Sequence, residues 1–267
     1  MCLRVLQGLM NNLCSTLIIA TRLPKKLNKE PLIDAVFEVR FSSKVPASVI
    51  LPGLLFNSLD GEKTIESLPI AQLPKPLRDA DPNLRFAPVT RVTWDLFIIS
   101  ISDFSLSISC KYPYPGWHTF KPAITKVVGI LSQSKIVAGV ERYSMKYVDL
   151  LPSTDNQQRV SMINFKVSIA DHNLEKEPFH LRIEIPREGF INAVQVVSSA
   201  HVELQNETKK EGLIVDVDTF VTLNNVPIGS VCEELSDKLE SIHLVNKAMF
   251  FDCLTPHSIE SLEPIYD

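Results

Sequence analysis

The sequence predicts an α+β fold in which an antiparallel β-sheet is covered by long amphipathic helices. Several segments alternate apolar and polar residues with the period of two that is typical of half-buried strands. Two longer segments place their apolar residues on one helical face. No helical pattern separates the later strands, and this favours an antiparallel meander over parallel β-α-β units.

The first predicted strand covers residues 33 to 42, which alternate cleanly. Its apolar face consists of Ala35, Phe37, Val39 and Phe41. Residues 45 to 59 are dense in apolar residues but contain Pro46 and Pro52, so they predict one broken helix or two short ones. Residues 60 to 88 are rich in proline and charge, and they predict a long ordered loop.

A hairpin of two strands is predicted next, at residues 91 to 102 and 104 to 110. The second strand has one apolar face, and its other face is small and polar. That polar face consists of Ser105, Ser107 and Ser109.

The stretch YPYPGW, residues 112 to 117, could be a ligand-binding aromatic loop or the corner between a strand and a helix. Apolar residues then recur at the spacing of one helical face, from Trp117 and Phe120 to Leu131. Because proline and glycine end a strand and permit a new direction, we interpret the stretch mainly as a corner.

The rest of the chain predicts further strands followed by helices. These strands are expected at residues 140 to 152, 160 to 169, 179 to 185, 191 to 204 and 212 to 223. A long helix is expected from Ser230 to about residue 254, because Ser230 and Glu233 have the spacing of a capping box. A short helix then starts with Thr255 as its N-cap and Pro256 as its first residue.

The order of strand, proline and glycine corner, and long helix occurs twice. It indicates two related α+β halves, residues 23–152 and 153–267, each laying one helix on a sheet. The alternative is a single helix-grip sheet with one long helix, as in START-like ligand-binding folds. Residues 1–22 predict a poorly specified N-terminal tail, too interrupted by polar residues to span a membrane.

Four runs of the sequence resemble a known family. They are LPKKLNKEPLIDAVFEVRF, YPGWHTFKPAITKVV, VERYSMKYVDLLP and HLVNKAMFFDCLTPHSIESLEP. Together they resemble a sporadically distributed family of prokaryotic proteins of about this length, which carries only a number and the label of unknown function. The resemblance spans nearly the whole chain from Leu23. It implies a bacterial cytoplasmic origin and brings no catalytic residues with it.

Composition disfavours several function classes. The 27 basic and 31 acidic residues give a net charge of −4 without a long basic block, which disfavours nucleic-acid binding. Nine glycines without a phosphate-loop motif disfavour nucleotide cofactors. Five scattered cysteines without a CxxC pair indicate a reducing compartment, so we expect a cytoplasmic protein without structural zinc or another cofactor.

Few residues suggest chemistry. His118 stands beside Trp117 at a helix N-terminus and could act as a base together with Arg142 and a carboxylate. Asp216 and Asp218 share one face of a strand, where cross-strand pairing with His180 and Arg182 of the strand at residues 179 to 185 explains them better than a metal ion does. The candidate ligand or partner surface comprises Tyr114, Trp117, His118, Arg142, His180, Arg182, Asp216 and Asp218, without an assigned catalytic residue or metal ligand.

The leading functional hypothesis is a non-enzymatic binding or protein-interaction module. The serine- and charge-bearing face of the sheet is then solvated or used for an unknown protein partner. Self-association through polar edge strands across a two-fold axis is a further possibility. The alternatives are a carrier of a small apolar ligand and an enzyme with a dispersed site near His118.

Overall fold

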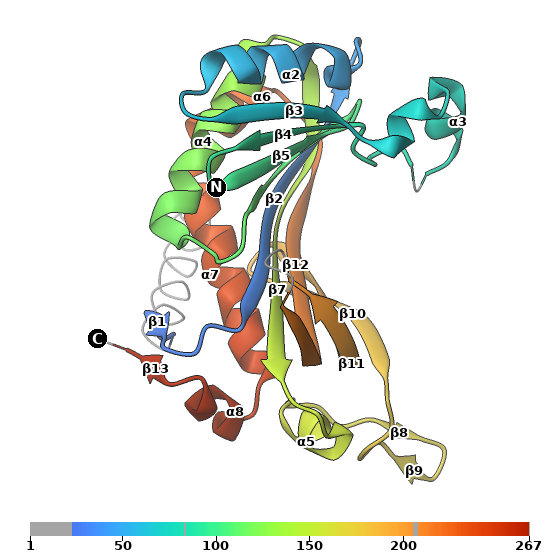
Figure 1. Cartoon of the computed structure of the whole chain (residues 1–267), viewed down its shortest axis with the longest axis vertical. Helices are drawn as coiled ribbons and strands as arrows, with labels where there is room; N and C mark the ends of the chain where they lie inside the picture. The colour runs from blue at the N-terminus through green and yellow to red at the C-terminus, as the bar shows by residue number, and fades with distance from the viewer. Residues whose placement is uncertain (1–22, 83, 205–207, 267) are drawn as a thin grey trace, which may run out of the picture. The chain divides into compact units, whose positions relative to one another are not determined.

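The computed structural model describes residues 23–82, 84–204 and 208–266, so the predicted tail at residues 1–22 lies outside the described residues. The described chain has the predicted α+β fold (Figure 1). Nine strands form one antiparallel sheet in the order β10-β11-β12-β7-β2-β6-β5-β4-β3, and helices pack against it.

The bounds of the elements are as follows. The strands of the large sheet are β2 (Leu32–Ser43), β3 (Lys63–Ser67), β4 (Thr90–Trp94), β5 (Phe97–Ile101), β6 (Ser105–Cys110), β7 (Val137–Pro152), β10 (His180–Arg187), β11 (Phe190–Glu203) and β12 (Lys209–Val226). Two small sheets pair β1 (Lys26–Leu27) with β13 (Pro264–Ile265) and β8 (Ser168–Ile169) with β9 (His172–Asn173). The helices are α2 (Ala47–Ser58), the 3₁₀ turn η1 (Pro69–Gln72), α3 (Lys75–Ala80), α4 (Trp117–Gln133), α5 (Asn156–Ser161), α6 (Ile228–Glu233), α7 (Leu235–Cys253) and α8 (Pro256–Ser261).

The chain divides into two compact units, each built from separate segments. Unit 1 consists of the chain up to Ile33, Lys146–Thr219 and the chain from Glu240. Unit 2 consists of Asp34–Met145 and Phe220–Leu239. Strands β2, β7 and β12 and helix α7 continue from one unit into the other. The predicted division into halves at residues 152 and 153 stays a prediction.

Unit 2 begins with the first predicted strand, and its core face is confirmed. Ala35, Phe37, Val39 and Phe41 are each at most 2% exposed. The predicted single strand at residues 91–102 is wrong, because the chain turns between Trp94 and Phe97, which pair across β4 and β5. Trp94 and Phe97 are both buried although they are three residues apart, so the alternation changes phase at the turn, and the single-strand prediction overlooked this change.

The segment from 60 to 88 is more ordered than a loop. Its first part forms β3, which pairs antiparallel with β4, and η1 and α3 follow. Short charged segments of this kind become strands through pairing with a neighbour, which sequence periodicity does not report.

Helix α4 confirms the predicted amphipathic stripe. Its buried residues include Phe120, Ile124, Val127 and Leu131, each fully buried. The helix contacts β6 and also α2, which itself contacts β4 and β5 (Figure 1). Residues 47 to 58 therefore form one continuous helix in spite of Pro52, because burial of one side of α2 stabilises it.

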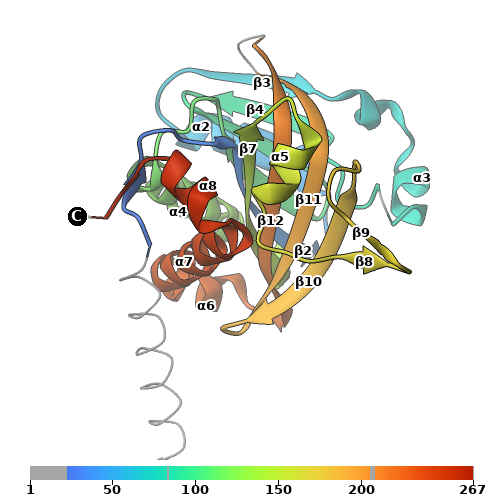
Figure 2. The ribbon, with the colours of Figure 1, turned by 90° about the horizontal axis from the view of Figure 1, so that it is seen from below.

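Unit 1 contains the predicted meander β10-β11-β12 (Figure 2). Its core joins apolar residues of β11 and β12 to the C-terminal turns of α7. The cluster includes Val194, Val196, Leu213, Val215, Val217, Met249, Phe250 and Phe251. The predicted strand at residues 160–169 is wrong over most of its length: α5 ends at Ser161, an isolated bridge joins Ile163 to Leu254, and a strand is formed by the last two residues alone, as β8.

The C-terminal helices begin elsewhere than predicted. The chain forms α6 and α7 in place of one helix, with Glu234 between them outside helical geometry at φ −104° and ψ 4°. The predicted capping box at Ser230 is wrong, because α6 starts two residues earlier with Pro227 at its N-cap. The cap of the last helix is confirmed, since the Thr255 side chain accepts a hydrogen bond from the Ser258 amide.

Candidate functional site

Tyr114, Trp117 and His118, three of the predicted surface residues, lie at the corner between β6 and α4. The rings of Tyr114 and Trp117 stand edge-on to the buried Phe120, at centroid distances of 6.2 and 6.3 Å. Gly116 caps α4 with φ 91°, and a Cβ there would come 2.9 Å from Nδ1 of His118. The stretch is the predicted strand-to-helix corner, and of the three predicted residues His118 is the exposed one.

Arg142 lies on β7 in unit 2. Its guanidinium carbon is 4.1 Å from the centroid of the Phe220 ring on β12. A cation above an aromatic face is attracted by the ring quadrupole, so this contact orients the guanidinium. The dispersed catalytic site that combines His118 with Arg142 stays a prediction.

The remaining predicted residues lie on β10 and β12 of unit 1. The sheet order places β11 between these strands, so the predicted direct cross-strand pairing of His180 or Arg182 with Asp216 or Asp218 is wrong. Arg182 pairs in register with Gln195 on β11. Alternation assigns residues to a face but does not say which strand comes next, and therefore the neighbour was misassigned.

Asp216 forms its ion pair with a residue of β7, the other strand next to β12. Nζ of Lys146 on β7 is 2.8 Å from Oδ2 of Asp216, and Arg182 forms a 3.1 Å ion pair with Glu184 on its own strand. Burial raises the pKa of Asp216, while the hydrogen bond and charge of Lys146 act in the opposite direction. Asp218 raises this pKa and Arg182 lowers it, which places both charges close to Asp216. Asp216 therefore belongs to a partly buried network of charges of both signs.

A second group of ionisable residues in unit 1 is more deeply buried. Asp149 on β7 is 5% exposed, and burial raises its pKa well above the ordinary value, with the charges of Glu30 and Asp216 adding to the effect. Burial also raises the pKa of Glu30 and lowers that of Lys247 on α7. Nζ of Lys247 donates a hydrogen bond to the carbonyl oxygen of Pro24 at 2.6 Å.

Asp149 therefore keeps its proton to a higher pH than an exposed aspartate does. Perturbed pKa values of this kind occur at catalytic sites and in structural clusters alike. Because the folded state binds the proton more tightly than the unfolded state, stability falls as the pH rises from the ordinary aspartate pKa through the raised value. The group can hold a proton, and its titration is linked to the folding of unit 1.

Polar contacts also join α7 to the sheet of unit 1. Oη of Tyr147 and Nδ1 of His243 are hydrogen-bonded at 2.9 Å. Nδ2 of the fully buried Asn246 donates to the carbonyl oxygen of Val217 at 2.8 Å. Buried polar groups of this kind require their partners, so these bonds select one position of the helix along the strands.

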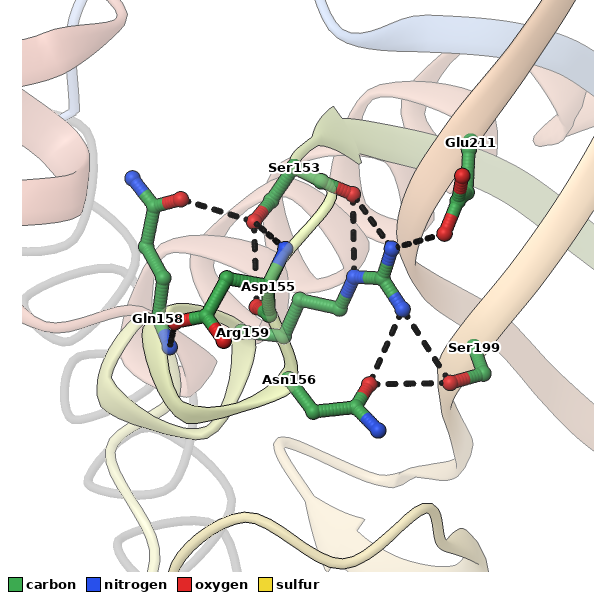
Figure 3. A network of polar contacts seen from close by, with 7 residues as sticks. All are labelled: Ser153, Asp155, Asn156, Gln158, Arg159, Ser199 and Glu211. Carbon is green, nitrogen blue, oxygen red and sulfur yellow. Dashed lines mark hydrogen bonds and ion pairs between the residues drawn. The ribbon is translucent and has the colours of Figure 1, made fainter.

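Arg159 on α5 is the centre of a polar network (Figure 3). Its side chain is 3% exposed, and Nε and Nη2 both donate to the carbonyl oxygen of Ser153, at 3.0 and 2.5 Å. Nη1 donates to Oδ1 of Asn156 at 2.9 Å and to Oγ of Ser199 on β11 at 3.1 Å. Nη2 also pairs with Glu211 on β12 and lowers its pKa. The guanidinium thereby joins α5 to two strands.

The start of α5 belongs to the same network. Oδ2 of Asp155 accepts a hydrogen bond from the amide of Gln158 at 2.9 Å, and Ser153 Oγ donates to Gln158 Oε1 at 2.8 Å (Figure 3). An acidic N-cap followed three residues later by glutamine is a helix-start signal. That signal could have predicted α5, which the sequence analysis missed, whereas the burial of Arg159 depends on contacts with β11 and β12.

Helix α2 of unit 2 exposes apolar side chains. Val49 is 76% and Phe56 45% exposed, although the opposite side of the helix, with Leu51 and Leu55, is fully buried. Gly53 lies between Val49 and Phe56 at helical spacing, and a Cβ there would meet nothing within 4 Å. We call Val49, Gly53 and Phe56 the apolar stripe. No residue of α2 is charged.

The apolar stripe was missed, although the sequence contains a signal for it. A surface helix normally has one apolar face, whereas residues 45 to 59 are apolar on all sides and carry no charge. The two prolines favoured a broken helix, and the faces of a broken helix cannot be assigned from spacing.

The described cysteine side chains are free thiols. Burial raises the pKa of Cys253 to about 11 and raises that of Cys110 further. A raised pKa leaves little thiolate at neutral pH, so both thiols are poor nucleophiles.

Over the described ranges of the chain, no three His, Cys, Asp or Glu residues come together in a group that could hold a metal ion. None of the described helices is both long enough and apolar enough to cross a membrane. No protein-family model matches the chain, and no curated protein matches it either. The resemblance to the prokaryotic family of unknown function stays a prediction.

Proposed function

We propose that the chain is a non-enzymatic protein-interaction module whose partner binds the apolar stripe of α2. The observation that carries this proposal is the exposure of Val49 and Phe56 on a helix that has no charged residue. Covering exposed apolar side chains lowers the free energy, and contiguous apolar patches on a surface mark interaction sites. A prokaryotic, cytoplasmic setting, which the family resemblance implies, is part of the proposal.

The spacing within the stripe indicates the kind of partner. Val49 and Phe56 are two turns apart on one helical face, and Gly53 leaves the backbone open between them. Packed helices insert a side chain of one helix into such a gap on the other. The partner therefore presents an amphipathic helix with a large apolar residue that enters beside Gly53.

We also infer a repeat of two runs of elements, whose bounds differ from those of the predicted halves, because β7 (Val137–Pro152) lies in the predicted first half but begins the second run. With β3, η1, α3, β8, β9 and α6 left out, the first run is β2-α2-β4-β5-β6-α4 and the second is β7-α5-β10-β11-β12-α7. In both runs the first strand neighbours the last strand in the sheet order, and the run ends in a long helix. This shared order supports the repeat. The serine-bearing strand β6 and the charged strand β12 then occupy corresponding places, each as the last strand of its run.

The test of the interaction proposal places a photo-crosslinking amino acid at Phe56 in the full chain, expressed in a bacterial cell. A matched control carries it at Ile169, which is 75% exposed on β8. The expected result is one discrete protein adduct at position 56 that is missing at position 169. The adduct should disappear when Val49→Lys is added, since a charge within the stripe opposes apolar docking.

An absence of adducts at position 56, or the same adducts at both positions, would overturn the proposed surface. Native mass spectrometry of the gently isolated protein separates the alternatives. A retained apolar molecule would favour the small-ligand carrier, and a retained polar substrate or metal would favour an enzyme with a dispersed site near His118.

A further inference from the structure

Strand β10 forms one border of the nine-stranded sheet. It pairs with β11 on one side, and in the part of the chain that the structure describes no strand pairs with its other edge (Figure 2). His180, Arg182, Ile183 and Glu184 are exposed along it. An edge strand with free backbone groups is a template for another strand.

The hydrogen-bonding phase of β10 follows from its pairing with β11. The amide of Ser198 donates to the carbonyl oxygen of Phe179 at 3.0 Å, immediately before the register pair His180 and Val197. Hydrogen-bonded pairs alternate along an antiparallel ladder, so the odd-numbered residues of β10 bond to β11. The even-numbered residues Arg182 and Glu184 consequently turn their amide and carbonyl groups to the open edge.

Two further observations agree with this phase. Pro186 is even-numbered, so its missing N–H falls on the open edge, where proline is tolerated. The carbonyl oxygen of the odd-numbered Ile185 accepts a hydrogen bond of 3.2 Å from Nδ2 of Asn192, its register partner on β11.

The order of side chains along β10 is self-complementary. A two-fold axis at Ile183 sets Arg182 opposite Glu184 of a second copy, and sets Leu181 opposite Ile185. Arg182 and Glu184 then form the hydrogen-bonded pairs between the two copies. This agrees with their backbone groups facing the open edge. An axis at Arg182 or at Glu184 would set like charges opposite each other, which disfavours those registers.

The charges and the apolar row are both available for such pairing. The side chains of Arg182 and Glu184 are 56% and 49% exposed and form a 3.1 Å ion pair with each other, and the two internal pairs of two copies can be exchanged for two pairs between the copies. Ile183 is 43% exposed and stands opposite Val194 of the unit 1 core. A second β10 would cover Ile183 and extend this apolar face.

We propose that a second copy of this chain binds the open edge of β10 antiparallel, with the two-fold axis at Ile183, so that two sheets join into one. About six main-chain hydrogen bonds form, because Pro186 lacks a donor for the outermost pairs. The residues involved belong to unit 1, and the proposal does not depend on the apolar stripe of α2.

The first test is sedimentation velocity of the full chain over a wide range of concentration. A dimer of twice 29.9 kDa is expected. Arg182→Glu and Glu184→Arg should each raise the dissociation constant about tenfold or more, because like charges then face each other. The double variant Arg182→Glu/Glu184→Arg should restore the dimer, since the opposite signs are exchanged about the same axis.

The second test is a disulfide across the axis. In the proposed register Ile183 faces itself in a non-hydrogen-bonded pair, with Cα atoms about 4.5 Å apart, which a disulfide can bridge. Ile183→Cys should therefore give a covalent dimer under mild oxidation, and the matched control Glu184→Cys on the same strand should not. Circular dichroism and a urea transition show whether each variant has kept its fold.

A chain that remains monomeric at every concentration overturns the proposal. So does a dimer that survives both single charge reversals and leaves Ile183→Cys without a cross-link, because such a dimer uses another surface. A double variant that stays monomeric contradicts the register at Ile183.

Discussion

Helices α2 and α5 occupy the same place in the order of elements, each after the first strand of its run, but they are held by opposite kinds of interaction. Helix α2 has no charged residue and is anchored by fully buried leucines, Leu51 and Leu55. Helix α5 has the sequence NQQRVS and is anchored by the buried guanidinium of Arg159.

The difference teaches that the place of a helix in the fold does not determine how it is stabilised. Apolar burial tolerates a helix with a second apolar side, so α2 can leave Val49 in water. A buried guanidinium requires a full set of acceptors, so α5 is surrounded by a specific network that includes Ser153 and Glu211. We therefore associate α2 with binding and α5 with structure.

The largest expected effect is in α2. Leu51→Ala should lower the free energy of unfolding by about 3 kcal/mol, because it removes buried methyl groups and leaves a cavity. Urea denaturation of the full chain measures this loss. A loss below about 1 kcal/mol would mean that α2 is not anchored by its leucines.

The next effect is in α5. Arg159→Ala should cost about 2 kcal/mol, because Ser153 and Ser199 lose a buried donor. The cost is smaller than for a fully buried ion pair, because the Glu211 side chain is 37% exposed and can be solvated. Arg159→Lys is the matched control: it keeps the charge but loses the planar fork, so it should recover part of the stability. Equal losses for both variants would show that the hydrogen bonds of the fork dominate.

The pH dependence should separate the two helices. Arg159 lowers the pKa of Glu211 in the folded state, so the ion pair contributes stability above the ordinary glutamate pKa and loses it as the pH falls through the lowered value. The effect of Arg159→Ala should therefore be smaller at about pH 3 than at pH 7. The effect of Leu51→Ala should not change, since α2 has no titratable side chain. Parallel pH profiles for the two variants would argue against this assignment.

The smallest effect is expected on the exposed side of α2. Val49→Ser should change the free energy of unfolding by no more than about 0.5 kcal/mol, because Val49 is 76% exposed. It should nevertheless weaken the photo-crosslinked adduct at position 56. A large loss of stability would show that Val49 supports the fold rather than a partner.

The sequence by itself determined the class of the fold and most of its strands and long helices, because alternation and helical spacing are local properties of the chain. The core faces of β2 and α4 and the Thr255 cap followed from such patterns. Of the predicted surface residues, the sequence correctly placed Arg182 and Asp216 on the strands that carry them, without their partners.

Only the tertiary structure decided which strands are neighbours. Asp216 on β12 was predicted to pair with a residue of β10, but it forms its ion pair with Lys146 on β7. The tertiary structure also decided the break between α6 and α7. The network of Arg159 and the exposure of Val49 depend on what packs against each helix. Contacts between residues far apart in the chain have no period in the sequence, so local patterns cannot report them.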